Sequence, residues 1–141
     1  MKTLVFLGAL LIVAPQTSIT GRWQWQGPAG WQRITLDIKA DGARLRGILR
    51  MGPGGSEPAT PAGFWEYFFD PTDFEVLNGK VSGNTISFEQ EVRTEPSSTR
   101  FLYTGIVEGE RIAFTREVLP NPKGPVMLGA HKLQFIVERV R

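Results

Sequence analysis

The sequence predicts an all-β fold, a single antiparallel up-and-down barrel of eight strands, and three observations support this prediction. From residue 19 onward, apolar and polar residues alternate with a period of two, as in strands that bury one face. Gly, Asn and Asp residues that favour tight turns separate the alternating runs. Two consecutive segments repeat the same hairpin pattern, and 141 residues with 41% hydrophobic content suit one domain with one core.

The first 18 residues are predicted to be a signal peptide. Lys2 supplies the positive start, and the uncharged apolar run from Leu4 to Ala14 has the length of a signal-peptide core. This run is too short to span a bilayer, so no transmembrane segment is predicted. We therefore expect residues 19–141 to fold as a barrel that is periplasmic or secreted. An uncleaved leader or a buried first strand is the alternative, because no small-x-small cleavage triplet follows Ala14.

The first three predicted strands place apolar side chains or glycine at every second position. These positions are Trp23 and Trp25 in the first strand, Ile34, Leu36 and Ile38 in the second, and Leu45, Gly47, Leu49 and Met51 in the third. Asp41 and Gly42 separate the second strand from the third, and glycine tolerates the positive φ that a tight hairpin needs. We therefore expect consecutive antiparallel strands that share one buried face.

A Gly- and Pro-rich connection at residues 52–63 follows the third strand and leads into an aromatic stretch. The aromatic residues are Phe64, Trp65, Tyr67, Phe68 and Phe69. In one interpretation this stretch is a lid over the barrel mouth, with Trp65, Tyr67 and Phe68 against the ligand, or an exposed patch that meets a partner or a membrane surface. In the other it is a short helix or strand whose rings plug the barrel.

The clearest internal signal is a repeat, because residues 78–92 and 104–118 align without a gap. Identical pairs include Gly79/Gly105, Val81/Val107, Gly83/Gly109, Ile86/Ile112, Phe88/Phe114, Glu91/Glu117 and Val92/Val118. Each copy reads as a strand, a tight turn and a second strand, so we predict two successive hairpins. A last strand from about residue 132 to 140 brings the count to eight, at which a sheet can close around side chains or one small ligand.

Short motifs at both ends of the predicted barrel resemble those of lipocalin-like, or calycin, proteins. Gly21, Arg22 and Trp23 give the Gly-x-Trp of a first barrel strand, which also looks like the opening of avidin-type barrels. The sequences of the two predicted hairpins, residues 79–88 and 103–116, resemble a short barrel domain of exported bacterial proteins. The resemblance implies that Arg139 covers Trp23, and a cation over an indole is worth about 1 kcal/mol when desolvated. No ligand residues are transferred, because the disulfide pair of lipocalins and the biotin-binding runs of avidins are missing.

Three polar residues are candidate anchors of an interior ligand pocket. Strand alternation places Gln90 and Arg116 at equivalent positions of the two hairpins, on otherwise apolar faces, and Tyr103 faces the same interior. Ligand pockets are mostly apolar with a few converging polar groups, which this pattern matches. A buried arginine is costly unless it is paired, so an inward Arg116 requires a carboxylate, a ligand anion or water. The alternative places these strand ends at the barrel mouth, with Arg116 solvated.

Catalytic and metal-binding signals are weak in this sequence. It has no cysteine, which excludes a thiol nucleophile and a Cys-ligated zinc site. His131 is the single histidine, and a role as general base would need partners that the sequence does not reveal. Asp70, Asp73 and Glu75 form an acidic turn that we interpret as solvated rather than as a cation site. We therefore predict neither a metal site nor a cofactor.

The charge pattern predicts no nucleic-acid partner. The formal net charge is only +2, and no strand interleaves basic and aromatic residues as a nucleic-acid platform does. Arg44, Arg46 and Arg50 share one strand face, which we interpret as a solvated outer surface.

The function favoured by these patterns is that of an exported barrel that binds a small, mostly apolar ligand in its interior. Arg116 would contact an anionic group where the ligand carries one. A second hypothesis is a cofactor-independent enzyme of the cyclase, isomerase or lyase type, which uses the same cavity. A third is an interaction domain with a filled barrel that recognises a partner through the aromatic stretch or the arginine face.

Overall fold

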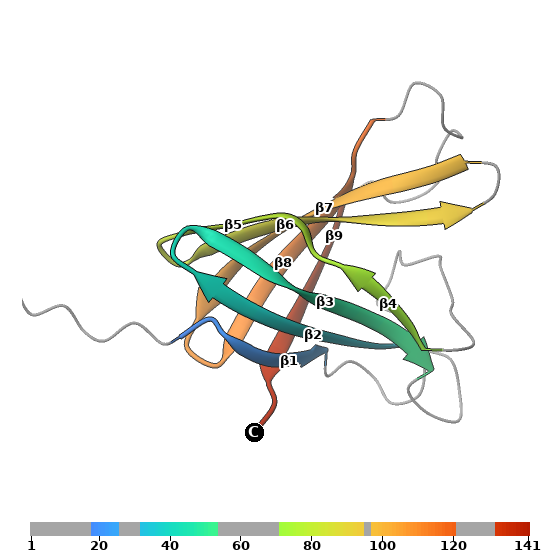
Figure 1. The fold of residues 1–141 in the computed structure, drawn as a ribbon. Coiled ribbons are helices and arrows are strands. Elements are labelled where there is room, and N and C mark those ends of the chain that lie inside the picture. Colours follow the sequence, from blue (N-terminus) through green and yellow to red (C-terminus); the bar gives the residue numbers. More distant parts are fainter. Residues whose placement is uncertain (1–17, 26–31, 54–70, 95–96, 121–131) are drawn as a thin grey trace, which may run out of the picture.

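The computed structural model describes residues 18–25, 32–53, 71–94, 97–120 and 132–141, and all regular elements in these ranges are β-strands (Figure 1). They are β1 (Gly21–Trp25), β2 (Gln32–Asp41), β3 (Arg44–Pro53), β4 (Thr72–Glu75), β5 (Leu77–Ser82), β6 (Thr85–Thr94), β7 (Ser97–Glu108), β8 (Arg111–Val118) and β9 (Lys132–Arg139). No helix long and apolar enough to cross a membrane occurs in these ranges.

The strands form one antiparallel sheet that closes on itself (Figure 1). β1 pairs with β2 on one side and with β9 on the other, and the β2–β3 pairing completes the ring. β4 and β5 pair with successive stretches of β3, so β4 is an additional strand beside a ring of eight. The predicted fold class is therefore confirmed, and the architecture agrees with the barrel that the resemblance implied.

Tight turns gather at one end of the barrel, here termed the closed end. The turns at Gly42, Gly83 and Gly109 join β2 to β3, β5 to β6 and β7 to β8, and their glycines have φ of 61°, 62° and 63°. Side chains with a Cβ rarely adopt this left-handed conformation, which explains why glycine stands at each turn. The two repeated segments form the β5–β6 and β7–β8 hairpins, as predicted. The chain leaves β1, β3, β6 and β8 at the opposite end, here termed the open end, whereas β4 continues into β5 along β3.

The predicted alternation of buried and exposed positions is also confirmed. Most inward-facing apolar residues on the long strands are no more than 8% exposed, including Ile34, Leu36, Leu49, Met51, Ile86, Phe88, Val107, Ile112, Phe114, Leu133, Phe135 and Val137. Four rings form one packed cluster on the inner face of β6–β9. Phe88 stacks on Tyr103 with centroids 4.7 Å apart, and Phe114 stacks on Phe135 at 5.5 Å. Edge contacts of 5.9–6.2 Å join the two stacks into what we term the aromatic cluster.

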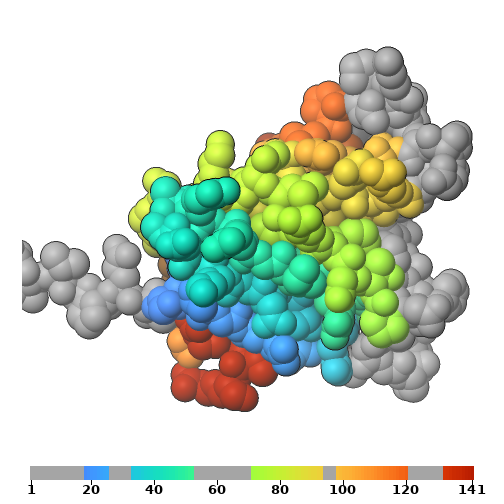
Figure 2. All heavy atoms as spheres, viewed as in Figure 1, coloured from blue at the N-terminus to red at the C-terminus, as the bar shows by residue number. Residues whose placement is uncertain are grey.

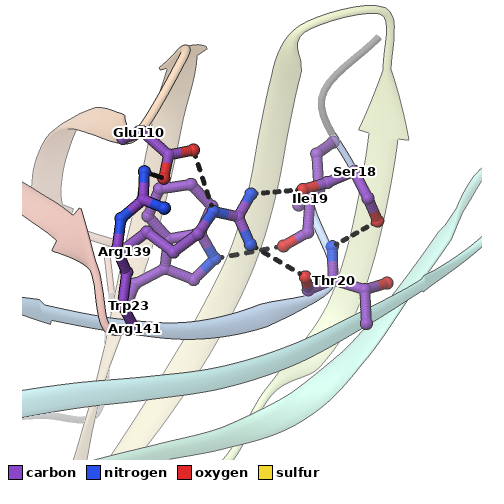
Figure 3. Close-up of polar contacts among 7 residues, drawn as sticks. All are labelled: Ser18, Ile19, Thr20, Trp23, Glu110, Arg139 and Arg141. Carbon is purple, nitrogen blue, oxygen red and sulfur yellow. Dashed lines mark hydrogen bonds and ion pairs between the residues drawn. The ribbon is translucent and has the colours of Figure 1, made fainter. Parts of the chain in front are cut away.

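Trp23 lies at the closed end with Arg139 over its ring, as the resemblance implied (Figure 3). Its side chain is 0% exposed, and its indole Nε1–H donates to the carbonyl oxygen of Ile19 at 3.0 Å. The guanidinium carbon of Arg139 lies 4.2 Å from the centroid of the Trp23 ring. The indole is thus fixed at its edge by a hydrogen bond and on its face by a cation.

Arg139 also connects the residues that precede β1 to the last strand, β9, through hydrogen bonds (Figure 3). Its Nη1 donates to the carbonyl of Thr20 at 3.1 Å, and its Nη2 donates to the carbonyl of Ser18. Its Nε donates to the Glu110 carboxylate at 3.2 Å, in the turn between β7 and β8. One side chain therefore connects the start of the barrel, its last strand and a hairpin turn, which seals the closed end.

The outer face of β3 carries the three arginines that the sequence placed together. Arg44, Arg46 and Arg50 are all exposed, so their predicted position on an outer surface is confirmed. Arg50 binds the Asp73 carboxylate of β4 through Nε at 2.6 Å and Nη2 at 3.0 Å. Asp73 therefore belongs to an ion pair on the outer wall seen in Figure 2, whereas Asp70 lies outside the described residues.

The pKa of the Asp73 carboxyl is lowered, mainly by the hydrogen bonds from Arg50 and further by its positive charge. A carboxyl with a depressed folded-state pKa adds stability above its unfolded pKa, and this contribution is lost as the pH falls through the folded-state pKa. We expect Arg50→Gln to return the Asp73 pKa toward its ordinary value in an NMR titration of the carboxyl carbon. Arg46→Gln is the control, because Arg46 pairs with Asp41 instead. An Asp73 titration unchanged by Arg50→Gln would contradict this assignment.

Candidate ligand-binding site

The three predicted anchors, Gln90, Tyr103 and Arg116, lie on three neighbouring strands of the inner wall. Tyr103 of β7 is the register partner of Arg116 on β8, and Gln90 of β6 pairs with Phe101, two residues before Tyr103. Gln90, Tyr103 and Arg116 are 1%, 0% and 2% exposed. The prediction that this face points inward is confirmed, and the alternative of a solvated Arg116 is wrong. We term these residues the polar trio; their role in binding stays a prediction.

A hydrogen bond fixes the orientation of the Gln90 amide. The Tyr103 hydroxyl donates to Gln90 Oε1 at 2.6 Å, which leaves the amide nitrogen to point the other way. Gln90 Nε2 lies 3.7 Å from the sulfur of Met51 on β3, the second strand from β6 in the ring. A thioether is a weak acceptor, so this donor keeps most of its capacity for a stronger one. The geometry offers a buried N–H group that a ligand oxygen could take over from the sulfur.

Arg116 is held by stacking. Its guanidinium carbon lies 3.7 Å from the centroid of the Phe101 ring and 6.0 Å from that of Tyr103. Stacking uses the flat face of the guanidinium, while its N–H donors point outward in its plane. A carboxylate, sulfonate or phosphate that binds Arg116 would therefore lie in that plane, beside the contacts that Arg116 already makes. This orientation favours recognition of a planar or forked anionic group.

Gln90 and Arg116 lie on the open-end side of the aromatic cluster, of which Tyr103 is itself a member. Phe88 and Phe114 precede Gln90 and Arg116 by two residues toward the closed end, so their rings form a layer beneath those two side chains. Beyond the trio, Thr99 on β7 is 6% exposed and faces the same interior. The interior therefore has an aromatic layer toward the closed end and polar groups on one wall toward the open end.

Trp65, Tyr67 and Phe68 lie outside the described residues, so their predicted contact with the ligand stays a prediction. The segment that contains them connects β3 to β4, and both strands meet it at the open end. His131 likewise lies outside the described residues. No group of three or more His, Cys, Asp or Glu side chains that could hold a metal ion occurs in the part of the chain that the structure describes.

Sequence reasoning missed Met51 as part of the site. Alternation placed it correctly on the buried face of β3, but alternation does not tell which residue it meets in the interior. Its contact with Gln90 joins residues 39 positions apart, and no local signal reveals such a pair.

Three grooves lined by described residues do not include the polar trio, and the third, of about 590 Å³, lies over β3 and β5. One, of about 490 Å³, runs over β1–β4 and contains Arg22, Asp37, Arg50 and Asp73. Another, of about 710 Å³, runs along β8 and β9. The first mixes both charge signs, and its Arg22–Asp37 and Arg50–Asp73 pairs neutralise one another, so it offers no strong field for a charged ligand.

Comparisons with protein-family models, with curated proteins and with solved structures find no match to this chain. The functional conclusion is therefore drawn from the geometry of the site.

Proposed function

We propose that this protein is an exported barrel that binds a small, mostly apolar ligand in the open-end half of its interior. The polar trio is the observation that carries the proposal. Three polar side chains from three neighbouring strands are buried together on an otherwise apolar wall, and ligand pockets are mostly apolar with a few converging polar groups.

The chemical groups of the polar trio indicate which groups a ligand would need in order to bind there. The ligand's apolar body would lie over the aromatic cluster, and an oxygen acceptor would take the N–H of Gln90 that now faces the Met51 sulfur. An anionic group would bind in the plane of the Arg116 guanidinium while that group stays stacked on Phe101. A small amphipathic acid meets all three requirements.

Export is the part of the proposal that rests on the N-terminal sequence. Lys2 and the apolar run from Leu4 to Ala14 support it. The N-terminal residue of the protein recovered from its producing cells tests this part, and an intact Met1 would refute it.

An enzyme that uses the same cavity is the alternative that remains open, but no specific observation favours it. The Tyr103 hydroxyl is the titratable proton donor of the trio, and it is engaged by Gln90 at 2.6 Å. A general acid or base is instead expected to be aimed at the reacting atoms.

A pair of fluorescent probes tests the binding proposal. Anilinonaphthalene sulfonate is apolar with one anionic group, and phenylnaphthylamine is the same ring system without the sulfonate. We expect the protein to bind both, and we expect Arg116→Met to weaken binding of the sulfonate probe about tenfold while affinity for the neutral probe stays within about twofold, since a charge-assisted bond is worth about 1.5–3 kcal/mol. Fluorescence titration measures both affinities.

Two variants keep this test decisive. Arg116→Lys retains the charge in case the methionine variant folds poorly, and Arg100→Met removes an arginine that binds Glu89 and Glu91 on the outer wall. Near-ultraviolet circular dichroism verifies native packing, because the sulfonate probe also binds partly folded chains. Failure of both probes to bind the native protein would favour the filled-barrel hypothesis, and equal loss of both in Arg116→Met would remove Arg116 as the anion contact.

A further inference from the structure

The outer wall of β7, β8 and β9 forms a regular grid of side chains that face away from the barrel. Cross-strand pairing fixes its four rows, each with one residue from each strand. From the closed end to the open end the rows are Glu108–Arg111–Glu138, Ile106–Ala113–Ile136, Thr104–Thr115–Gln134 and Leu102–Glu117–Lys132. We term this surface the β7–β9 face.

The two middle rows of the β7–β9 face carry no charge. Ile106 and Ile136 are 47% and 48% exposed, more than any other large hydrophobic side chain in the described ranges. They flank the small Ala113 on the central strand, and the groove of about 710 Å³ includes all three residues. The two middle rows thus form an uncharged block of six neighbouring outward positions, in which the two isoleucines are the large apolar side chains.

We propose that the β7–β9 face binds the same face of a second copy of this chain. The twofold axis lies in the interface, perpendicular to the strands and midway between the two middle rows. Rotation about it exchanges those rows, so Ile106 meets the partner's Thr104, Ala113 meets the partner's Thr115, and Ile136 meets the partner's Gln134. Each isoleucine thus faces a polar side chain of the partner. The small side chain of Ala113 leaves room for the partner's Thr115.

The charged outer rows support this choice of axis. The same rotation places Arg111 over the partner's Glu117 and Glu138 over the partner's Lys132. Arg111 and Glu138 also form an ion pair with each other at 3.4 Å within one chain, and Glu108 faces the partner's Leu102. Symmetry repeats both contacts between the copies, so opposite charges border the uncharged block on both sides. An axis parallel to the strands would instead place Arg111 over the partner's Arg111 and Glu108 over its Glu138. Juxtaposed like charges cost several kcal/mol at an interface, so charge selects the antiparallel arrangement.

This arrangement closes as a dimer, because each copy uses its β7–β9 face once and presents no second copy of it. The β8 strands of the two copies run antiparallel across the interface. The two open ends therefore point in opposite directions, and the interior site of each copy stays accessible. The dimer and the proposed ligand site are accordingly independent, and either can fail without the other.

Charge reversals test the dimer, by sedimentation equilibrium of the protein isolated from its producing cells. We expect a concentration-dependent dimer whose dissociation constant rises at least about tenfold in Arg111→Glu and in Glu117→Arg, because each variant places two like-charge pairs in its own homodimer. An equimolar mixture of the two variants should regain the dimer, since opposite charges then meet at both contacts. Rescue by mixing is specific to the pairing of Arg111 with the partner's Glu117.

Ile136→Glu is a second test of the dimer, and Ile48→Glu is its matched control. Both isoleucines are large, outward and similarly exposed, at 48% and 41%, but Ile48 lies on β3, outside the β7–β9 face. We expect Ile136→Glu to abolish the dimer and Ile48→Glu to leave it unchanged. A monomer at all concentrations would overturn the proposal. A dimer that tolerates Ile136→Glu, or two charge variants whose mixture stays monomeric, would overturn the assigned surface or its register.

Discussion

Replacing Trp23 with alanine is expected to lower the free energy of unfolding by about 3–5 kcal/mol, the range for removing a fully buried large aromatic side chain. Trp23 is 0% exposed, and it binds the Ile19 carbonyl through its indole N–H. Alanine would remove the ring on which Arg139 lies at 4.2 Å. The loss therefore combines apolar contact area, a buried hydrogen bond and the cation–π contact in one substitution.

Urea denaturation followed by circular dichroism measures this loss. Trp25→Ala is the matched control, because Trp25 is the same residue type on the same short strand but is only partly buried. We expect the Trp25 variant to lose clearly less stability than the Trp23 variant. Equal losses would mean that strand β1 contributes through aromatic area alone and that the contact with Arg139 has no special role at the closed end.

The strands and hairpins could be predicted because each is fixed by a short-range pattern. Alternation identified the buried face of every long strand, and Gly42, Gly83 and Gly109 marked the turns. The division of the stretch after Pro71 into β4 and β5 was not predictable in this way. The two strands are separated at Val76, and Asn78 has φ of 51° where the β5–β6 register shifts. Such an irregularity depends on how the sheet curves to close, which no local pattern records.

The candidate site shows the same limit. Alternation placed Gln90, Tyr103 and Arg116 on one apolar face, and the repeat placed Gln90 and Arg116 at equivalent positions of the two hairpins. In the barrel their environments differ, because Gln90 bonds to Tyr103 whereas Arg116 stacks on Phe101. β6 and β8 lie on opposite sides of β7, so equal positions in the repeat meet different neighbours. Sequence periodicity predicts which face of the sheet a side chain occupies. The residues that it contacts in the interior depend on how the strands are arranged in the closed ring.

The identical repeat positions Gly79 and Gly105 illustrate this difference further. At Gly79 a Cβ would lie 2.0 Å from the backbone oxygen of Leu45 on β3. At Gly105 a Cβ would instead lie 2.7 Å from the side-chain atoms of Ile112 and Phe114. The first glycine allows two backbones to approach, and the second makes room for core side chains. One residue type at one repeat position therefore has two separate physical causes.

Gly79→Ala is consequently expected to lower the free energy of unfolding by about 3 kcal/mol, at the upper end of the cost of overpacking. Leu45 and Gly79 form one of only two register pairs between β3 and β5, the contact through which these neighbours close the ring. Backbone atoms cannot rotate away as a side chain does, so the strands must separate there. We expect Gly105→Ala to cost about 1–2 kcal/mol, because Ile112 and Phe114 can adjust their rotamers.

Thermal and urea denaturation of both variants measure this difference. Gly83→Asn serves as the control, because Gly83 has φ of 62° with no atom near its Cβ position, and asparagine tolerates that conformation. Its loss should stay below about 1 kcal/mol. If Gly79→Ala lowered the free energy of unfolding by less than Gly105→Ala, β3 and β5 could separate at this contact without loss of the fold. Close approach of these two backbones would then not be required for barrel closure, and packing of the aromatic cluster would govern stability instead.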